Sequence, residues 1–255
     1  QEAFSLLRVG RLIRVISNES GEKLVPYHEG VRETVISQLK DLERVEYHKD
    51  LAMALETPNE LDAKSLAIHF NAAGEVEKAL HYTIVAAEEA TKALAFDNAA
   101  RFYKMALGLN PKKKEQQLQV KLGDALANAG RGAEAAQAYL IAAKTATSTD
   151  AIELERRAAE QFLINGYIKE GISVLRKVLA KVDIKLPETT QGALISYLFT
   201  RFQVWLRGLG FKERAEKEIN SKELLRIDVC WSAIVGLAYV NTKRAIDFQA
   251  RHLLM

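Results

Sequence analysis

The amino-acid sequence predicts an all-α fold built from helical hairpins that recur along the chain, and three observations support this. Alanine and leucine dominate a chain of 255 residues with only 14 Gly and 4 Pro, a composition that favours helix. Apolar residues recur with helical spacing over most of the chain. One pattern of small and large residues returns every 36 residues. A short β-hairpin near the start is the one expected departure.

The repeating pattern is clearest in residues 122–142. Its small residues would let two helices cross closely, with Gly130 in the turn between them and Tyr139 filling the gap above Gly123. The three related sets are Leu94, Ala99, Tyr103, Ala106 and Pro111; Gly123, Gly130, Ala135, Tyr139 and Ala142; and Ala159, Gly166, Gly171, Leu175 and Val178. Helix–turn–helix units of about 34 residues with such spacings are typical of tetratricopeptide repeats. The sequence therefore predicts a right-handed, tetratricopeptide-like helical solenoid.

The start of the chain predicts a different unit, the C-terminal part of a winged-helix domain over residues 1–56. Residues 12–16 and 23–27 are strand-like and flank the turn residues 17–21. Two helices should follow, over residues 29–39 and 42–56. A wing that reads DNA needs a recognition helix before it, and residues 1–9 are too short for one. We therefore expect a winged-helix remnant without direct nucleic-acid contact.

Residues 57–188 are predicted as the tetratricopeptide-repeat array, beginning with two helices that turn at Gly74. Residues 148–150 should cap a helix starting near residue 151, and residues 183–187 should form an extended link. Residues 189–255 are predicted to continue the solenoid as further helical hairpins, with Ser221 as a cap and with truncation at the end. The aromatic side chains of this last part are expected in the core; they are Phe199, Phe202, Trp205 and Phe211.

Several stretches resemble known signalling proteins. Residues 27–33 and 47–56, with the sequences YHEGVRE and YHKDLAMALE, look like the segment that closes the ATPase module of bacterial STAND ATPases. Residues 67–74 resemble the first repeat after such a module. Residues 223–232 and 247–254 look like the helical region of large bacterial serine/threonine protein kinases fused to a STAND-type AAA ATPase. The resemblance implies the regulatory repeat region of such a kinase.

The chain has no motif for phosphate chemistry. It lacks a Gly-x-x-x-x-Gly-Lys-Ser/Thr loop and the glycine loop, His-Arg-Asp and Asp-Phe-Gly motifs of protein kinases. We therefore expect no enzymatic activity and no cofactor in this chain; the resemblance assigns ATP and magnesium to other domains of the parent protein. The net charge of +3 gives no argument for nucleic acid.

The cysteine and the histidines predict structural roles. A single cysteine, Cys230, excludes an internal disulfide and is expected to be buried. With no signal peptide or membrane span apparent, it indicates a cytoplasmic location. The five histidines lack the spacing of a zinc site. His28 and His48 are expected to pack where the hairpin meets the helices.

Polar residues at helical spacing mark a candidate binding groove. In tetratricopeptide repeats the first helix of each pair lines the concave face, and the usual peptide-facing positions correspond here to Gln117, Asp124, Asn128, Glu153, Arg156 and Glu160. The alternative is an ordinary solvated helix face. The expected partner is a protein or peptide, or a neighbouring domain of the same chain, with the oligomeric state left open.

These observations together predict a non-catalytic protein-interaction or sensor module of a bacterial signal-transduction ATPase fused to a serine/threonine protein kinase. A ligand in the groove would bias an off–on equilibrium by binding the two states with different affinity. Two alternatives stay open. The chain could be a freestanding tetratricopeptide adaptor, or the sensor array of a MalT-like STAND transcription regulator.

Overall fold

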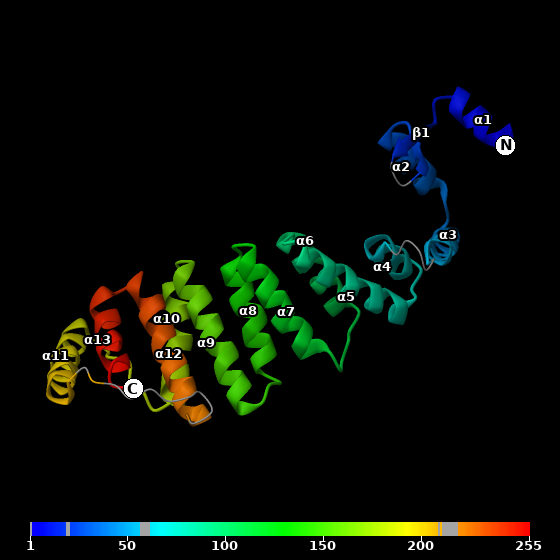
Figure 1. The fold of residues 1–255 in the computed structure, drawn as a ribbon. Coiled ribbons are helices and arrows are strands. Elements are labelled where there is room, and N and C mark those ends of the chain that lie inside the picture. The colour runs from blue at the N-terminus through cyan, green and yellow to red at the C-terminus, as the bar shows by residue number, and fades with distance from the viewer. Residues whose placement is uncertain (1, 19–20, 57–61, 209, 211–218) are drawn as a thin grey trace. The chain divides into compact units, whose positions relative to one another are not determined.

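The computed structural model describes residues 2–18, 21–56, 62–208, 210 and 219–255, and it is mainly helical. Within these residues 76% of the chain is helix, in thirteen helices, with one two-stranded antiparallel sheet (Figure 1). The expected all-α class is confirmed at this level. The chain divides into two compact units, residues 1–82 and 83–255, each described below by itself. The three domains predicted from the sequence, which end at residues 56, 188 and 255, stay a prediction.

The first unit contains the predicted hairpin and one helix that was not predicted. Its elements are α1 (Glu2–Val9), β1 (Ile13–Asn18), β2 (Gly21–Pro26), α2 (Glu29–Gln38), α3 (Asp41–Leu55), α4 (Ala63–Ala72) and the first residues of α5 (Val76–Lys92). The strands pair antiparallel, with Ile13 opposite Pro26 and Asn18 opposite Gly21. The predicted helices α2 and α3 lie within one residue of their expected bounds.

Polar contacts tie α3 to the helices that follow it. The Glu56 carboxylate accepts from Lys78 Nζ at 2.5 Å and from the Tyr82 hydroxyl at 2.7 Å. Nδ1 of His48 lies 2.8 Å from Nδ1 of His69 on α4. His48 therefore packs between α3 and α4 rather than at the hairpin, and His28 is exposed beside Tyr27. The expected place of His48 was wrong because α3 turns its half-buried face toward α4. His28 does lie between the hairpin and α2, but it is exposed and does not pack there as expected.

The second unit is a succession of helices, of which those from α6 to α10 each pack against the next. After the rest of α5 come α6 (Phe96–Gly108), α7 (Glu115–Asn128), α8 (Gly132–Ala143), α9 (Ser148–Ile164), α10 (Ile168–Lys181), α11 (Thr190–Arg207), α12 (Ser221–Ala238) and α13 (Thr242–His252). The order of contacts is regular from α6 to α10. Then α12 packs on α9 and on α13, and α11 packs on α13.

Three turns in this unit share one backbone geometry. Residues Leu94, Gly130 and Gly166 stand 36 residues apart, and each has a positive φ, of 56°, 75° and 83°. After each of them, a backbone N–H donates at 2.8 Å to the carbonyl five residues earlier. This arrangement satisfies carbonyl groups at the end of the preceding helix. The sequence period of 36 residues is thus also a period of the backbone.

The close helix crossing expected at Gly123 is present. A Cβ atom at Gly123 would lie 2.7 Å from Cδ1 of Tyr139, so only glycine leaves room for this ring. Tyr139 is buried there, with 1% of its surface exposed. Further along, a continuous core joins α9, α10, α12 and α13, and it includes Leu163, Leu175, Leu179, Val229, Cys230, Leu237 and Phe248.

Two caps lie just before the predicted residues, and α9 begins three residues earlier than residue 151, where it was expected. The side chain of Thr147 caps α9, which begins at Ser148, and the side chain of Asn220 caps α12, which begins at Ser221. In both cases the residue just before the predicted one has the extended backbone that a cap requires, and its side-chain oxygen accepts an early helix N–H. The link expected over residues 183–187 is present as an irregular connection over 184–187, after a turn in which Asp183 has a φ of 58°.

The aromatic residues of α11 are not in the core. Phe199, Phe202 and Trp205 are 62%, 54% and 74% exposed, and Phe211 lies outside the described residues. The prediction was wrong because α11 uses its opposite, small-residue face to pack on α13. Cys230 is fully buried, as expected, and burial raises its pKa to about 12. None of the helices in the described part of the chain combines the length and apolar character of a membrane span.

Candidate functional site

The candidate groove contains a pocket of about 540 Å³ in the second unit. Four of the six predicted groove residues line it: Asp124 and Asn128 of α7, and Arg156 and Glu160 of α9. Glu153 binds Arg156 from one turn earlier on α9, and Gln117 is exposed on α7 without lining the pocket. The remaining lining residues are Ala127, Tyr139, Arg157, Gln161 and Trp231.

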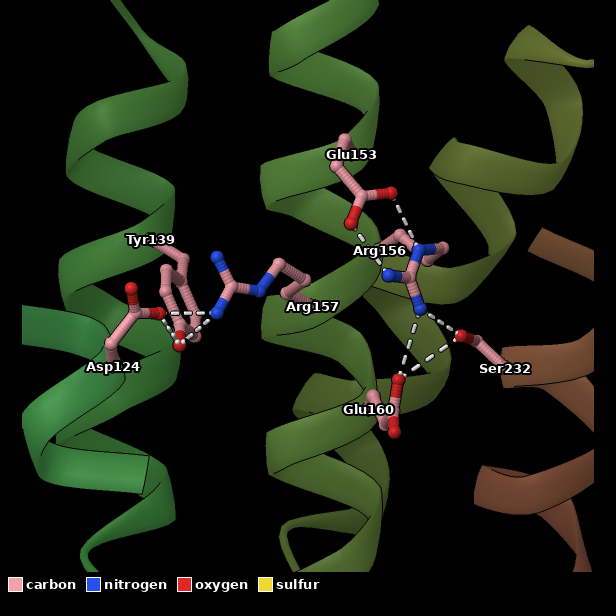
Figure 2. Close-up of polar contacts among 7 residues, drawn as sticks. All are labelled: Asp124, Tyr139, Glu153, Arg156, Arg157, Glu160 and Ser232. Atoms are coloured by element: carbon pink, nitrogen blue, oxygen red, sulfur yellow. Dashed lines mark hydrogen bonds and ion pairs between the residues drawn. The ribbon is translucent and has the colours of Figure 1, made fainter. Parts of the chain in front are cut away.

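Arg157 joins three helices on one side of α9. Its Nη2 donates to Asp124 Oδ1 on α7 and, at 2.8 Å, to the hydroxyl of Tyr139 on α8. The Tyr139 hydroxyl donates in turn to Asp124 Oδ1 at 2.8 Å. The guanidinium also lies over the tyrosine ring, with Cζ 4.3 Å from the ring centroid (Figure 2). The three side chains therefore form a closed cluster between consecutive helices.

Arg156 makes a second cluster on the other side of α9. Its Nε and Nη2 donate to the two oxygens of Glu153 at 2.7 and 2.5 Å. Its Nη1 donates to Glu160 Oε2 at 3.1 Å and to the hydroxyl of Ser232 on α12. Ser232 itself donates to Glu160 at 3.0 Å, so this cluster links α9 to α12.

The surroundings raise the pKa of two side chains of the site, Tyr139 and Arg156. Burial and the hydrogen bond to Asp124 raise the pKa of Tyr139, so its hydroxyl keeps its proton and remains a donor. Burial opposes the charge of Arg156, but the hydrogen bond and charge of Glu153 outweigh it and raise its pKa. The carboxylates Asp124, Glu153 and Glu160 each accept a hydrogen bond from one of the two arginines.

A second hollow of about 300 Å³ lies one repeat earlier, on α5, α6 and α7, so that only α7 lines both hollows. Its lining residues are Glu88, Thr91, Lys92, Tyr103, Lys121, Asp124, Ala125 and Asn128. Adding 36 to seven of these eight numbers gives a residue that lines the larger pocket. Asp124 and Asn128 belong to both. The two hollows are therefore equivalent places in successive repeats, and they adjoin.

The cluster around Arg157 also has an earlier counterpart. Lys121 Nζ donates to Glu88 Oε1 at 2.6 Å beside Tyr103, and this pair raises the pKa of Lys121. The acid, the tyrosine and the base follow one another at spacings of 15 and 18 residues in both copies. The next shift of 36 gives Glu160, Leu175 and Ala193, which lack the tyrosine and the base. Glu160 instead meets Arg156 and Ser232, so the repeated contact ends there.

Sequence reasoning missed the partners of the groove residues. Tyr139 was recognised only as a packing residue, and Arg157, Trp231 and Ser232 were not singled out. A search for an acid, a tyrosine and a base at fixed spacing would have found Arg157 by its likeness to Lys121. No local sequence pattern indicates Trp231 or Ser232. These residues belong to α12 and lie at the site only because α12 packs on α9.

The described residues hold no group of three or more His, Cys, Asp or Glu side chains placed to bind a metal ion. Comparison with known proteins gives no further guide, since no family model, curated protein or solved structure matches the chain.

Proposed function

We propose that the part of the predicted array that lies in the second unit, residues 83–188, is of the tetratricopeptide type and that the two adjoining hollows are part of a groove that binds an extended protein segment. One observation carries this proposal: the turn, the acid–tyrosine–base cluster and the hollow all recur at 36 residues. Repeats of this kind stack so that equivalent positions line a continuous surface.

The chemistry of the groove suits a peptide backbone. Most of the charged side chains are paired with one another, so the groove does not select strongly for an acidic or a basic ligand. Lys92, at the edge of the second hollow, is exposed and has no described hydrogen bond. Gln161 lines the larger pocket, and no hydrogen bond of its side chain is present within the described residues. Asn128 adds a second amide shared by both hollows. Amide side chains both donate and accept, as a peptide backbone does.

The wider role rests on the resemblance to STAND ATPases. In this proposal the chain is a non-catalytic interaction or sensor module of a bacterial signal-transduction ATPase fused to a serine/threonine protein kinase. A bound segment acts by preferring one of two states of the parent protein, since a ligand shifts an equilibrium only by its difference in affinity. ATP and magnesium belong to the parent domains.

Peptide selection tests the groove. A random peptide library displayed on phage is selected against the whole chain, and the affinities of the enriched peptides are measured by fluorescence anisotropy. Gln161→Trp fills the larger pocket and should weaken binding at least about tenfold. Gln137→Trp is the matched control, because Gln137 is exposed and lines a different hollow that shares no residue with these two. Failure to enrich any peptide, or equal effects of the two variants, would overturn the proposal.

The open reading frame around this chain tests the wider role. A P-loop and a kinase catalytic loop encoded upstream would support the signalling kinase. A helix–turn–helix domain encoded downstream would favour the MalT-like regulator, and a start codon close to Gln1 would favour the freestanding adaptor. A rise in melting temperature on adding ATP and magnesium would contradict the absence of a nucleotide site in this chain.

A further inference from the structure

Helix α11 carries a broad apolar face that no described part of its unit covers. Seven large side chains on it are between 47% and 74% exposed: Leu194, Ile195, Leu198, Phe199, Phe202, Trp205 and Leu206. At about 100° per residue, these positions fall within about 140° of the helix circumference. A contiguous apolar patch of this kind marks an interaction surface.

The opposite side of α11 is the one that holds it in place. Ala193, Thr200 and Val204 are buried where α11 packs on α13. Arg251 of α13 adds polar contacts, donating to the Ser196 hydroxyl at 2.8 Å and to the carbonyl of Lys185 at 2.8 Å. The helix therefore has a small-residue face toward its own unit and a large-residue face directed away from it. A helix that is apolar on both sides is typical of a helix between two layers.

The spacing of the exposed residues fits a second helix. Ile195, Leu198, Phe202 and Trp205 alternate at intervals of three and four residues, the seam of a helix pair. The rings of Phe202 and Trp205 already stack, with centroids 5.9 Å apart. Two of the large side chains of the face are thus already in contact with each other.

We propose that this face pairs with the same face of a second copy of the chain, so that two α11 helices form the centre of a symmetric dimer. Seven large side chains exposed to this degree offer on the order of 700 Å² per copy, since large side chains bury on the order of 150–250 Å² each. Two copies would bury about 1,400 Å², within the range of stable interfaces. A two-fold axis lets one patch serve both partners.

The charges around the face favour a second copy over an anionic membrane. Within α11 the only charged residues are Arg201 and Arg207. Arg207 donates to the carbonyl of Leu254 at 2.9 Å, which leaves Arg201 as the one exposed cation on this helix without a described partner. Helices that lie on anionic membranes carry a strongly basic polar face. This inference concerns a different surface from the groove and does not depend on it.

Sedimentation velocity of the whole chain tests the dimer between about 1 µM and about 100 µM. The mass should rise from 28.5 kDa to twice that value, and added salt should leave the dimer intact or strengthen it. Phe202→Glu places a charge in the middle of the face and should raise the dissociation constant at least about tenfold. Gln203→Glu is the matched control, with the same charge on the next, exposed residue outside the face, and it should dimerise like the parent.

A fluorescence measurement checks which surface is buried. Trp205 and Trp231 are the two tryptophans, so Trp231→Phe leaves Trp205 as the sole reporter. Its emission should shift to the blue as the dimer forms, and the additional Phe202→Glu change should abolish the shift. Circular dichroism confirms that the variants remain helical. A monomer at the highest concentration, a dimer that Phe202→Glu leaves unchanged, or a monomer that sediments with phosphatidylserine vesicles would each overturn the proposal.

Discussion

Arg156 and Arg157 are neighbours on α9, and the contacts that they make differ in kind. Arg157 turns toward α7 and α8, where it completes a cluster with Asp124 and Tyr139. Arg156 turns toward α12, where it holds Glu153, Glu160 and Ser232 together. Both clusters are visible side by side (Figure 2). The first is a repeated contact with an earlier copy at Lys121, and the second occurs where the repetition ends.

The comparison shows that arginine joins helices here in two ways. One contact has a counterpart in an earlier repeat, and the other has none. A repeated contact needs only that each copy of the sequence keep the same few positions, as Glu88, Tyr103 and Lys121 do for the earlier copy. The contact at Arg156 instead joins α9, where the repeated contact ends, to α12, whose sequence follows another pattern. It does so with a less exposed guanidinium, whose side chain is 17% exposed against 32% for Arg157. Removing each contact should therefore have a different cost.

The largest effect is expected for Arg156→Ala. This change leaves Glu160 and Ser232 without their cation and should lower the free energy of unfolding by about 2–4 kcal/mol, because a partly buried charge loses its partner. Urea denaturation followed by circular dichroism measures it. Arg156→Met keeps most of the side-chain volume, so it should recover only the part of the lost free energy of unfolding that comes from packing. A loss under about 0.5 kcal/mol for Arg156→Ala would show that the cluster does not join α9 to α12.

A smaller effect is expected when one hydroxyl is removed from the repeated contact. Tyr139→Phe takes a donor from Asp124 and an acceptor from Arg157, which should cost about 1–2 kcal/mol. Tyr103→Phe is the matched control in the earlier copy, where the hydroxyl makes no hydrogen bond within the described residues, and it should cost less than about 0.5 kcal/mol. Equal losses of free energy in the same urea titration would mean that the tyrosine hydroxyl contributes equally to stability in the two copies.

The three equivalent turns allow a stabilising change. Leu94 has a φ of 56° where its counterparts 36 and 72 residues later are glycines. A left-handed backbone is unfavourable for leucine by about 1–2 kcal/mol, and Leu94 is 72% exposed, so little packing is lost on replacing it. Leu94→Gly should raise the free energy of unfolding by about 0.5–1 kcal/mol, seen as a higher melting temperature. Gly130→Ala, at the equivalent turn, should lower it by a similar amount, and the same sign for both would refute the equivalence.

The smallest effect is expected when one copy of the repeated contact is made to resemble the other. Arg157→Lys gives the later copy the base of the earlier one. The ammonium cannot bond Asp124 and Tyr139 while stacking on the ring as the guanidinium does, so a loss of about 0.5 kcal/mol is expected. Lys121→Arg should be close to neutral. A gain in stability for Arg157→Lys would indicate that the ring contact contributes nothing.

Local sequence patterns predicted most of the helices and the hairpin, but few of the contacts between helices. The helices, the hairpin and the approach of Tyr139 to Gly123 follow from periodicity, turn chemistry and residue size, which act within a few residues or within one repeat. Helix α1 was missed because residues 2–9 are short and carry no cap signal. The aromatics of α11 were placed in the core because an apolar stripe shows that a face avoids water but does not identify the surface that covers it.

For the candidate site, likewise, the sequence predicted several residues of the pocket but not the residues that they contact. Asp124, Asn128, Arg156 and Glu160 follow from the spacing on α7 and α9, and they do line one pocket. Their partners could not be derived, since Ser232 and Trp231 come from a helix more than seventy residues away from Glu160. The sequence also could not show that the arginines are already bound to carboxylates. Because of that pairing, the arginines of the larger pocket offer little free charge to a ligand.

The two hollows share Asp124 and Asn128, and this sharing would affect how many ligands can bind at the same time. Two short peptides, one in each hollow, would compete for the same carboxylate and the same amide, so filling one site would disfavour the other. A single longer peptide would use the shared pair once and escape that conflict. If the groove binds peptides as proposed, a peptide long enough to cross both hollows would bind with a stoichiometry of one.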